Sequence, residues 1–191
     1  MKKTNPKLWG KLQAQLAPGE LKLDSATLEG HQGDKWFATG RPEAVALPRS
    51  SKAVSTILRF AHRHQIPVTP RGAGYGYVGG CVPLRGGIAL SVARMRRIKE
   101  IHEDDFVAVA QPGVITADLQ AKAEAKGLYY PPDPASRADC SIGGNVATNA
   151  GGPRCLKYGV TSDYVLGLEV VLPDGTITRV GSRTHKNKTG F

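Results

Sequence analysis

The stretch PRGAGYGYVGG, residues 70–80, carries the strongest structural signal in the chain. Apolar segments at 66–70 and 88–92 flank it and predict two strands. The glycines between them expose many backbone N–H groups, because glycine has no Cβ to block a close approach. A loop of this kind is able to bind a phosphate group by direct N–H donation. A glycine-rich hairpin loop without a ligand is the alternative.

Two better-known phosphate loops do not fit this stretch. A dinucleotide fingerprint needs a helix directly after its glycines. Here the chain continues with further helix breakers, namely Gly79, Gly80, Pro83, Gly86 and Gly87. A Walker loop needs Gly-Lys-Ser or Gly-Lys-Thr, which does not occur in the sequence. A strand–loop–strand arrangement therefore remains.

A second stretch, SRADCSIGGNVATNAGG at residues 136–152, contains almost no bulky side chain. We expect a loop on which a large, flat ligand lies against the backbone, with Ser141 and the N–H groups of 142–144 as donors. A tightly packed helix of small residues is the alternative. The two stretches are about seventy residues apart in the sequence. One ligand that contacts both stretches explains their unusual composition better than two unrelated causes.

The rest of the chain predicts a mixture of helices and strands. Helices are expected over 5–16, over 51–64 with a cap at Ser50 or Ser51, and over 116–126 with a cap at Thr116. Strands are expected over 44–48, 98–101 and 106–111, as a buried segment over 165–172, and over 176–180. Residues 17–40 are expected to be irregular.

The charge is unevenly distributed. The chain has 26 Lys and Arg against 16 Asp and Glu, a formal net charge of +10. Residues 49–99 contain ten basic residues and no acidic one. Such a segment favours an anion, which could be a phosphate ligand, a nucleic acid or an acidic partner. A solvated surface is the alternative, and no nucleic-acid-binding motif accompanies the charge.

The remaining composition excludes several classes of protein. Hydrophobic residues make up 40% and charged residues 22%, which is a globular balance. No apolar run approaches the ~20 residues of a membrane span, and we expect no secretory signal at the start. Cys81, Cys140 and Cys155 match neither a disulfide framework nor a zinc spacing. We expect free thiols in a reducing cytoplasm and no metal site.

Seven motifs in order carry a resemblance to a known family. They are PRSSKAV (48–54), PRGAG (70–74), QPGV (111–114), YPPDP (130–134), SIGGNVATNAGGP (141–153), LKYGVT (156–161) and VLGLEVVLPDG (165–175). The segment from about residue 40 to residue 191 resembles the FAD-binding (PCMH-type) domain of the vanillyl-alcohol oxidase and p-cresol methylhydroxylase flavoproteins. Within that family it is most similar to the FAD subunit of bacterial glycolate oxidase and to D-lactate dehydrogenases.

The resemblance implies an α+β fold with two lobes and FAD between them. It implies an N-terminal helical extension over 1–40 and a FAD-binding domain over 41–191, with a small lobe to about 100 and a larger lobe after it. It also implies that the domain is incomplete at its C-terminus and that the cap domain of the family is absent.

The resemblance also implies which residues hold the cofactor. Those expected at the pyrophosphate are Pro70, Arg71, Gly72, Ala73, Gly74, Tyr75, Gly76 and Tyr77. Those expected beside the flavin and its ribityl chain are Pro134, Ala135, Ser136, Cys140, Ser141, Ile142, Gly143, Gly144, Asn145, Thr148, Asn149, Ala150, Gly151, Gly152, Tyr158 and Gly159. Some relatives attach FAD covalently through a His in the first loop. Tyr75 occupies that position here, so non-covalent FAD is expected.

The implied function is the oxidation of a 2-hydroxy acid, glycolate or D-lactate, by hydride transfer to flavin. The implied partners are this substrate, held by a cap domain, and other subunits that include an iron–sulfur protein, with no nucleic acid. The expected location is the cytoplasm, with peripheral association with the inner face of the membrane as a further option. The five histidines form no constellation, so no catalytic base is named, and we expect this chain alone to be inactive. Alternatives are a flavin-binding fragment without activity and a basic anion- or nucleic-acid-binding module.

Overall fold

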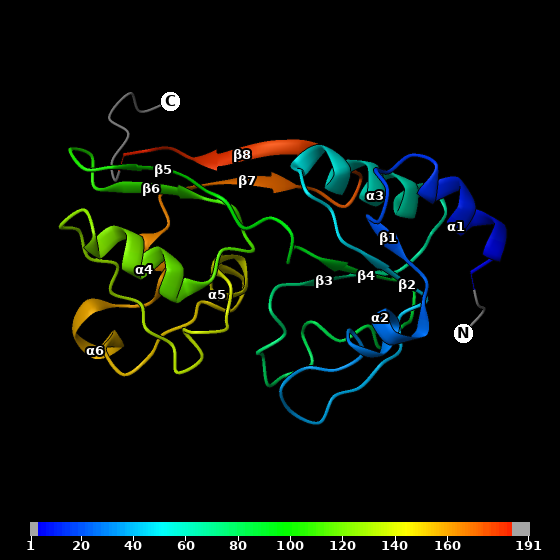
Figure 1. The fold of residues 1–191 in the computed structure, drawn as a ribbon, viewed down its shortest axis with the longest axis horizontal. Coiled ribbons are helices and arrows are strands. Elements are labelled where there is room, and N and C mark those ends of the chain that lie inside the picture. Colours follow the sequence, from blue (N-terminus) through cyan, green and yellow to red (C-terminus); the bar gives the residue numbers. More distant parts are fainter. Residues whose placement is uncertain (1–3, 185–191) are drawn as a thin grey trace.

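The computed structural model describes residues 4–184 of the 191-residue chain, and its elements form two lobes (Figure 1). The first lobe runs from α1 to β4 and the second from β5 to β8. The elements of the first lobe are α1 (Pro6–Gln13), β1 (Leu21–Lys22), α2 (Ser25–Glu29), β2 (Ala44–Ala46), α3 (Ser51–Arg63), β3 (Val68–Arg71) and β4 (Ile88–Ser91). The α+β fold that the resemblance implied is confirmed.

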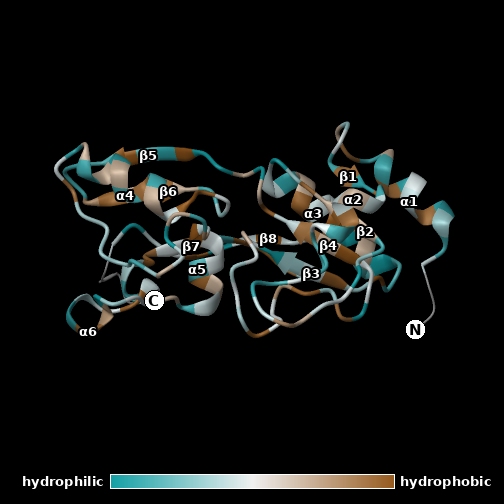
Figure 2. Ribbon diagram, turned by 60° about the horizontal axis from the view of Figure 1, so that its bottom comes forward, coloured by the Kyte–Doolittle hydropathy of each residue, from teal (hydrophilic) through white to brown (hydrophobic). Residues whose placement is uncertain are grey.

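A four-stranded sheet forms the centre of the first lobe, in the order β1-β2-β4-β3. Strands β2, β4 and β3 are parallel, and β1 is antiparallel to β2. Parallel strands are usually covered on both faces, and this is the case here. Residues Ile57 and Phe60 of α3 pack on one face, whereas Leu28 of α2 packs on the other against Val45 and Ala89. Figure 2 shows apolar residues gathered where α3 meets β2 and β4.

Helix α3 begins where the sequence predicts it. The Ser50 hydroxyl accepts a hydrogen bond from the Ala53 N–H at 3.2 Å, which satisfies one of the unpaired N–H groups of the first turn. Helix α1 begins in the same way, with the Asn5 side chain accepting from the Lys7 N–H.

The second lobe contains two antiparallel hairpins and several short helices. Its elements are β5 (Ile98–His102), β6 (Val107–Ala110), α4 (Thr116–Glu124), α5 (Ile142–Thr148), α6 (Cys155–Tyr158), a 3-10 helix (Thr161–Tyr164), β7 (Gly167–Val171) and β8 (Ile177–Gly181). Strand β5 pairs with β6, and β7 pairs with β8. The predicted pairing of 98–101 with 106–111 is confirmed.

The β7–β8 hairpin joins the two lobes, because it runs along α3 (Figure 1). The Ser51 hydroxyl at the start of α3 donates to the Glu169 carboxylate on β7. One turn later, the Ser55 hydroxyl donates to the Gly175 carbonyl in the hairpin turn. These two bonds fix the orientation of the hairpin on the helix.

Four sequence predictions are wrong in detail. Residues 17–40 are not irregular, since they contain β1 and α2. Residues 141–152 are not a loop throughout, because 142–148 form a helix of small residues, which was the alternative for this stretch. The 165–172 segment is not buried, since its residues 167–169 are exposed and 170–171 are only partly buried. Finally, Thr116 is not the cap of α4 but lies inside its first turn, where its hydroxyl contacts the Cys140 carbonyl.

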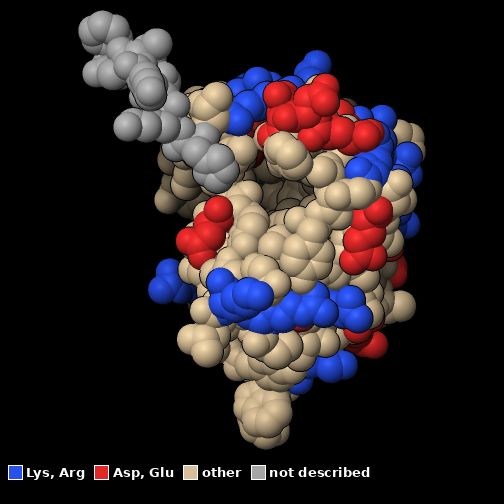
Figure 3. All heavy atoms as spheres, turned by 90° about the vertical axis from the view of Figure 1, so that its left-hand side faces the viewer, with Lys and Arg blue, Asp and Glu red and all other residues tan. Residues whose placement is uncertain are grey.

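The outer end of the second lobe carries charges of both signs. In Figure 3, Asp and Glu side chains gather above a hollow, and Lys and Arg side chains form a row below it. This face is therefore not the uniformly basic surface that a nucleic acid would select. Among the described residues, no helix is long and apolar enough to cross a membrane.

Candidate functional site

The loop between β3 and β4 presents a row of unused hydrogen-bond donors. Within the described part of the chain, none of the backbone N–H groups from Ala73 to Val78 donates a hydrogen bond. The space beside Gly76 is open, since a Cβ placed there would have no atom within 4 Å. The first glycine loop therefore has both the donors and the room that a phosphate group needs.

Arg71, at the end of β3, supports this loop from inside. Its guanidinium donates to the Gly33 carbonyl at 2.6 Å and contacts the Cys81 sulfur at 3.4 Å. The guanidinium also lies directly beneath Gly74, whose φ is +83°, so a side chain at Gly74 would collide with it. Arg71 thus brings a positive charge to the loop while its donors hold neighbouring segments.

The second stretch contributes a surface rather than free donors. The Ile142 N–H donates to the Val114 carbonyl and the Gly143 N–H to the Pro112 carbonyl, both at 2.8 Å. The Gly144 N–H donates to the Ser141 hydroxyl at 3.3 Å. The expectation that these three N–H groups are available to a ligand is therefore wrong, because helix capping and packing use them.

The two stretches nevertheless meet in space. A Cβ placed on Gly72 would lie 2.6 Å from the Ser141 Oγ and 3.3 Å from the Gly144 Cα. The absence of a side chain at Gly72 thus lets the loop of the first lobe touch the start of α5 in the second.

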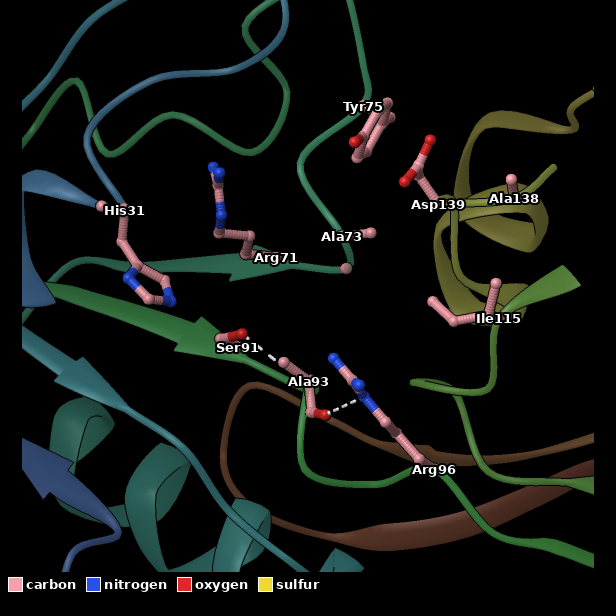
Figure 4. Close-up of a pocket in the computed structure, with 12 residues that line it drawn as sticks. His31, Arg71, Ala73, Tyr75, Ser91, Ala93, Arg96, Ile115, Ala138 and Asp139 are labelled. Carbon is pink, nitrogen blue, oxygen red and sulfur yellow. Dashed lines mark hydrogen bonds between the residues drawn. The ribbon is translucent and has the colours of Figure 1, made fainter. Parts of the chain in front are cut away.

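A cleft of about 340 Å³ opens beside this contact, between the lobes (Figure 4). Four predicted residues line it: Arg71, Gly72, Ala73 and Tyr75. The sequence analysis did not assign the other lining residues, which are Gly30, His31, Ser91, Ala93, Arg96, Ile115, Ala138 and Asp139. They come from segments that only the folded chain brings together.

Tyr75 and Asp139 face each other across the top of this cleft (Figure 4). Partial burial, with a smaller contribution from the Asp139 carboxylate, raises the pKa of the Tyr75 hydroxyl above its usual value. The Lys35 ammonium lies 5.0 Å from the centre of the Tyr75 ring. Tyr75 therefore stays a neutral donor at physiological pH.

His31 and Arg96 line the opposite part of the cleft (Figure 4). The His31 Nδ1 lies 2.9 Å from the Thr27 carbonyl, which makes Nδ1 the protonated nitrogen of a neutral ring. Burial, and to a lesser degree Arg71, lowers the pKa of His31. The Arg96 Nε donates to the Ala93 carbonyl at 2.6 Å. Arg96 belongs to the basic segment 49–99, whereas no sequence motif marks His31.

The other predicted residues lie outside the lining of the cleft. They are Pro70, Gly74, Gly76, Tyr77, Pro134, Ala135, Ser136, Cys140, Ser141, Ile142, Gly143, Gly144, Asn145, Thr148, Asn149, Ala150, Gly151, Gly152, Tyr158 and Gly159. Three of them, Cys140, Ser141 and Asn145, are buried. The Asn145 side chain donates to the Thr116 hydroxyl at 2.7 Å, so it serves internal packing. As cofactor contacts, these twenty positions stay predictions.

Most basic side chains of the segment 49–99 do not line the cleft. Three of its arginines, Arg49, Arg94 and Arg97, surround a separate shallow depression next to Gln111. All three are exposed, as expected for solvated surface cations. Of the ten basic residues in this segment, Arg71 and Arg96 are the two that line the cleft between the lobes.

Comparison with known families matches residues 42–181 to the FAD binding domain. The chain belongs to this FAD-binding family. The resemblance drawn from the seven motifs is thereby confirmed, and FAD is the cofactor of the family.

Relatives of this FAD-binding chain include enzymes named for 2-hydroxy acids. A glycolate oxidase subunit of Bacillus subtilis is 48% identical over 150 residues, which are 78% of this chain and 32% of that protein. A D-lactate dehydrogenase of Anaerostipes hadrus is 38% identical over 191 residues, covering 99% of this chain and 40% of that protein. A D-2-hydroxyglutarate dehydrogenase of Stutzerimonas stutzeri is 39% identical, with 98% and 41% covered. The chain therefore spans about two fifths or less of the length of these relatives.

Solved structures share the fold of this FAD-binding chain. It superposes on alkyldihydroxyacetonephosphate synthase with a TM-score of 0.83 at 24% identity, covering 95% of this chain and 35% of that one. It superposes on p-cresol methylhydroxylase with a TM-score of 0.78 at 23% identity, covering 92% and 35%. At these identities the likeness establishes the PCMH-type fold.

Proposed function

We propose that this chain is the FAD-binding part of an oxidoreductase that oxidises a 2-hydroxy acid by hydride transfer to flavin. The observation that carries the proposal is the row of unused N–H groups from Ala73 to Val78, beside the cleft where the glycine loop meets α5. A pyrophosphate matches these donors in charge and size. Family membership identifies FAD as the ligand that contains this pyrophosphate.

The residues present fit FAD. The open space at Gly76 admits a phosphate group next to the loop N–H groups, and Arg71 adds a positive charge behind them. The small residues of α5 offer a flat surface on the other side. FAD, when bound, supplies the hydride acceptor, and the chain supplies its binding and orientation. Because Tyr75 stands where some relatives have a His, we propose that this binding is non-covalent.

The names of three relatives support the substrate class, since glycolate, lactate and 2-hydroxyglutarate are all 2-hydroxy acids. Because the chain spans about two fifths or less of these proteins, we propose that substrate binding and acid–base chemistry need further chain or further subunits. One relative is itself named as a subunit. Three free cysteines support a cytoplasmic location.

The purified chain tests the proposal. It should be yellow or turn yellow with added FAD, and denaturation should release the flavin. Dye reduction with glycolate or D-lactate should require the remaining parts of the enzyme. A colourless chain that does not take up FAD, and that binds DNA with a steep salt dependence, would favour the basic module instead.

A further inference from the structure

Asp34 ties the N-terminal segment to the first glycine loop. One carboxylate oxygen accepts the Gly79 N–H at 2.8 Å, and the other accepts the Trp36 N–H at 2.8 Å. The first bond joins residues 45 positions apart in the sequence. The second closes a tight turn that keeps the carboxylate in place. Asp34 thus bridges two irregular segments that no helix or strand connects.

Two further contacts fasten the same pair of segments. The Lys35 N–H donates to the Gly76 carbonyl at 3.1 Å, in the middle of the phosphate-binding part of the loop. The Arg71 guanidinium donates to the Gly33 carbonyl from the start of the loop. Residues 33–35 therefore hold the glycine loop at its beginning, its middle and its far end.

We propose that Asp34 is a positioning residue for FAD: it fixes the loop in the conformation in which the N–H groups from Ala73 to Val78 face the pyrophosphate. This inference rests on the proposed function. Asp34 precedes the matched family region, 42–181, and lies in the segment for which the sequence predicts no regular structure.

The physical reason is preorganisation. A loop rich in glycine loses much conformational entropy when it is ordered around a ligand. If the protein orders the loop beforehand, the ligand no longer has to supply that free energy, and the affinity rises. A carboxylate suits the task because its hydrogen bonds to N–H groups are stronger than neutral ones. The hydrogen bond from the Trp36 N–H, and to a lesser degree that from the Gly79 N–H, keeps the pKa of Asp34 below its usual value. The carboxylate is therefore charged at neutral pH.

Titration of FAD into Asp34→Ala and Asp34→Asn variants tests the proposal. Asp34→Ala removes both acceptors and should weaken FAD binding about tenfold or more. Asp34→Asn keeps one acceptor oxygen and should recover part of the affinity. The matched control is Asp174→Ala, because Asp174 also accepts a backbone N–H, from Thr176 at 2.8 Å, but in the β7–β8 turn. It should leave the FAD affinity unchanged.

A spectroscopic readout separates loop positioning from general stability. The chain has two tryptophans, and Trp9 is buried in the core of the first lobe. In a Trp9→Phe background, Trp36 is the single reporter, next to Asp34 and 5.8 Å from the Tyr77 ring. Asp34→Ala should shift its emission in the folded, FAD-free protein, whereas Asp174→Ala should not.

The outcomes distinguish the two proposals. If the wild-type chain binds FAD and Asp34→Ala binds it equally well, Asp34 is not a positioning residue while the proposed function stands. Equal weakening in the Asp174→Ala control would also overturn the inference. Failure of the wild-type chain to bind FAD would overturn the proposed function and, with it, this inference.

Discussion

Gly72 lies against Ser141, close enough that a Cβ on Gly72 would be 2.6 Å from the Ser141 Oγ. The two residues belong to different lobes and are 69 positions apart (141 − 72 = 69). Because Ser141 caps α5 through the Gly144 N–H, a displacement of Ser141 would disturb the start of that helix. The contact therefore couples the phosphate loop to the surface proposed for the flavin.

Gly72→Ala should separate these two segments. The new methyl group must displace Ser141, for which we expect a loss of about 1–3 kcal/mol in unfolding free energy and weaker FAD binding. Denaturant unfolding and FAD titration measure both effects. Gly80→Ala is the control, because a Cβ at Gly80 meets no atom within 4 Å. If the two variants behave alike, the lobes are not in contact at Gly72.

Gly76→Val should weaken FAD binding without unfolding the protein. The position is open and its φ is not positive, so the unfolding free energy should change by no more than about 0.5 kcal/mol. The side chain would occupy the space beside the free N–H groups, and we expect FAD affinity to fall at least about tenfold. Unchanged affinity would remove the first loop from the cofactor site.

Gly74→Val is a less informative change in the same loop. The positive φ at Gly74 and the Arg71 guanidinium beneath it mean that any side chain there distorts the loop itself. A loss of FAD binding in Gly74→Val would therefore not separate a blocked site from a misfolded loop, whereas Gly76→Val does.

The fold was predictable where local signals are strong. The Ser50 cap, the apolar face of α3, and the short apolar segments of β5 and β6 on either side of the acidic residues 103–105 are properties of contiguous residues. Strand β1 was not predictable, because two residues become a strand only through their pairing with β2. The α5 helix was only the second of two alternatives, because its glycines favour a loop, while its stability comes from the Ser141 cap and from packing against Pro112.

The candidate site was predictable only in part, because some of its residues come from segments that are distant in the sequence. The high glycine content identifies the first loop in the sequence. Four of the residues predicted there line the cleft, namely Arg71, Gly72, Ala73 and Tyr75. His31 and Asp139 reach it from segments that carry no motif for a ligand, so only the tertiary structure reveals them. Asn145 lies in a motif, and its side-chain amide donates to the Thr116 hydroxyl inside the protein, so its role as a cofactor contact stays a prediction.

Acid precipitation of the FAD-loaded protein should leave all flavin in the supernatant. The reason is Tyr75, which stands where some relatives have a His that attaches FAD and which is neutral at physiological pH. Absorbance of the supernatant and of the dissolved pellet measures the partition. Flavin that stays with the pellet would contradict non-covalent binding.

Glu169→Gln should remove part of the acid sensitivity of the protein. The hydrogen bond from the Ser51 hydroxyl is the main reason why the pKa of Glu169 lies below its ordinary value of 4.5. The charged carboxylate therefore stabilises the folded state above pH 4.5. The contribution is lost as the pH falls through the lowered pKa. Because about a third of the Glu169 side chain is exposed to solvent, which screens its interactions, we expect a difference of only about 0.5 kcal/mol between wild type and variant at neutral pH.

Unfolding free energies of both proteins across the acid range measure this difference. It should be constant above pH 4.5 and shrink towards zero below it. A difference that grows as the pH falls would mean that Ser51 does not stabilise the charged form of Glu169.

The most direct test of the central claim is competition against FAD by its two halves. The FAD that stays with the purified chain after gel filtration, with ADP or riboflavin present, is separated by chromatography and quantified. If the N–H groups from Ala73 to Val78 bind the pyrophosphate, ADP displaces FAD and riboflavin at the same concentration does not. Displacement by riboflavin with no effect of ADP would contradict the assignment of the glycine loop as the phosphate-binding element.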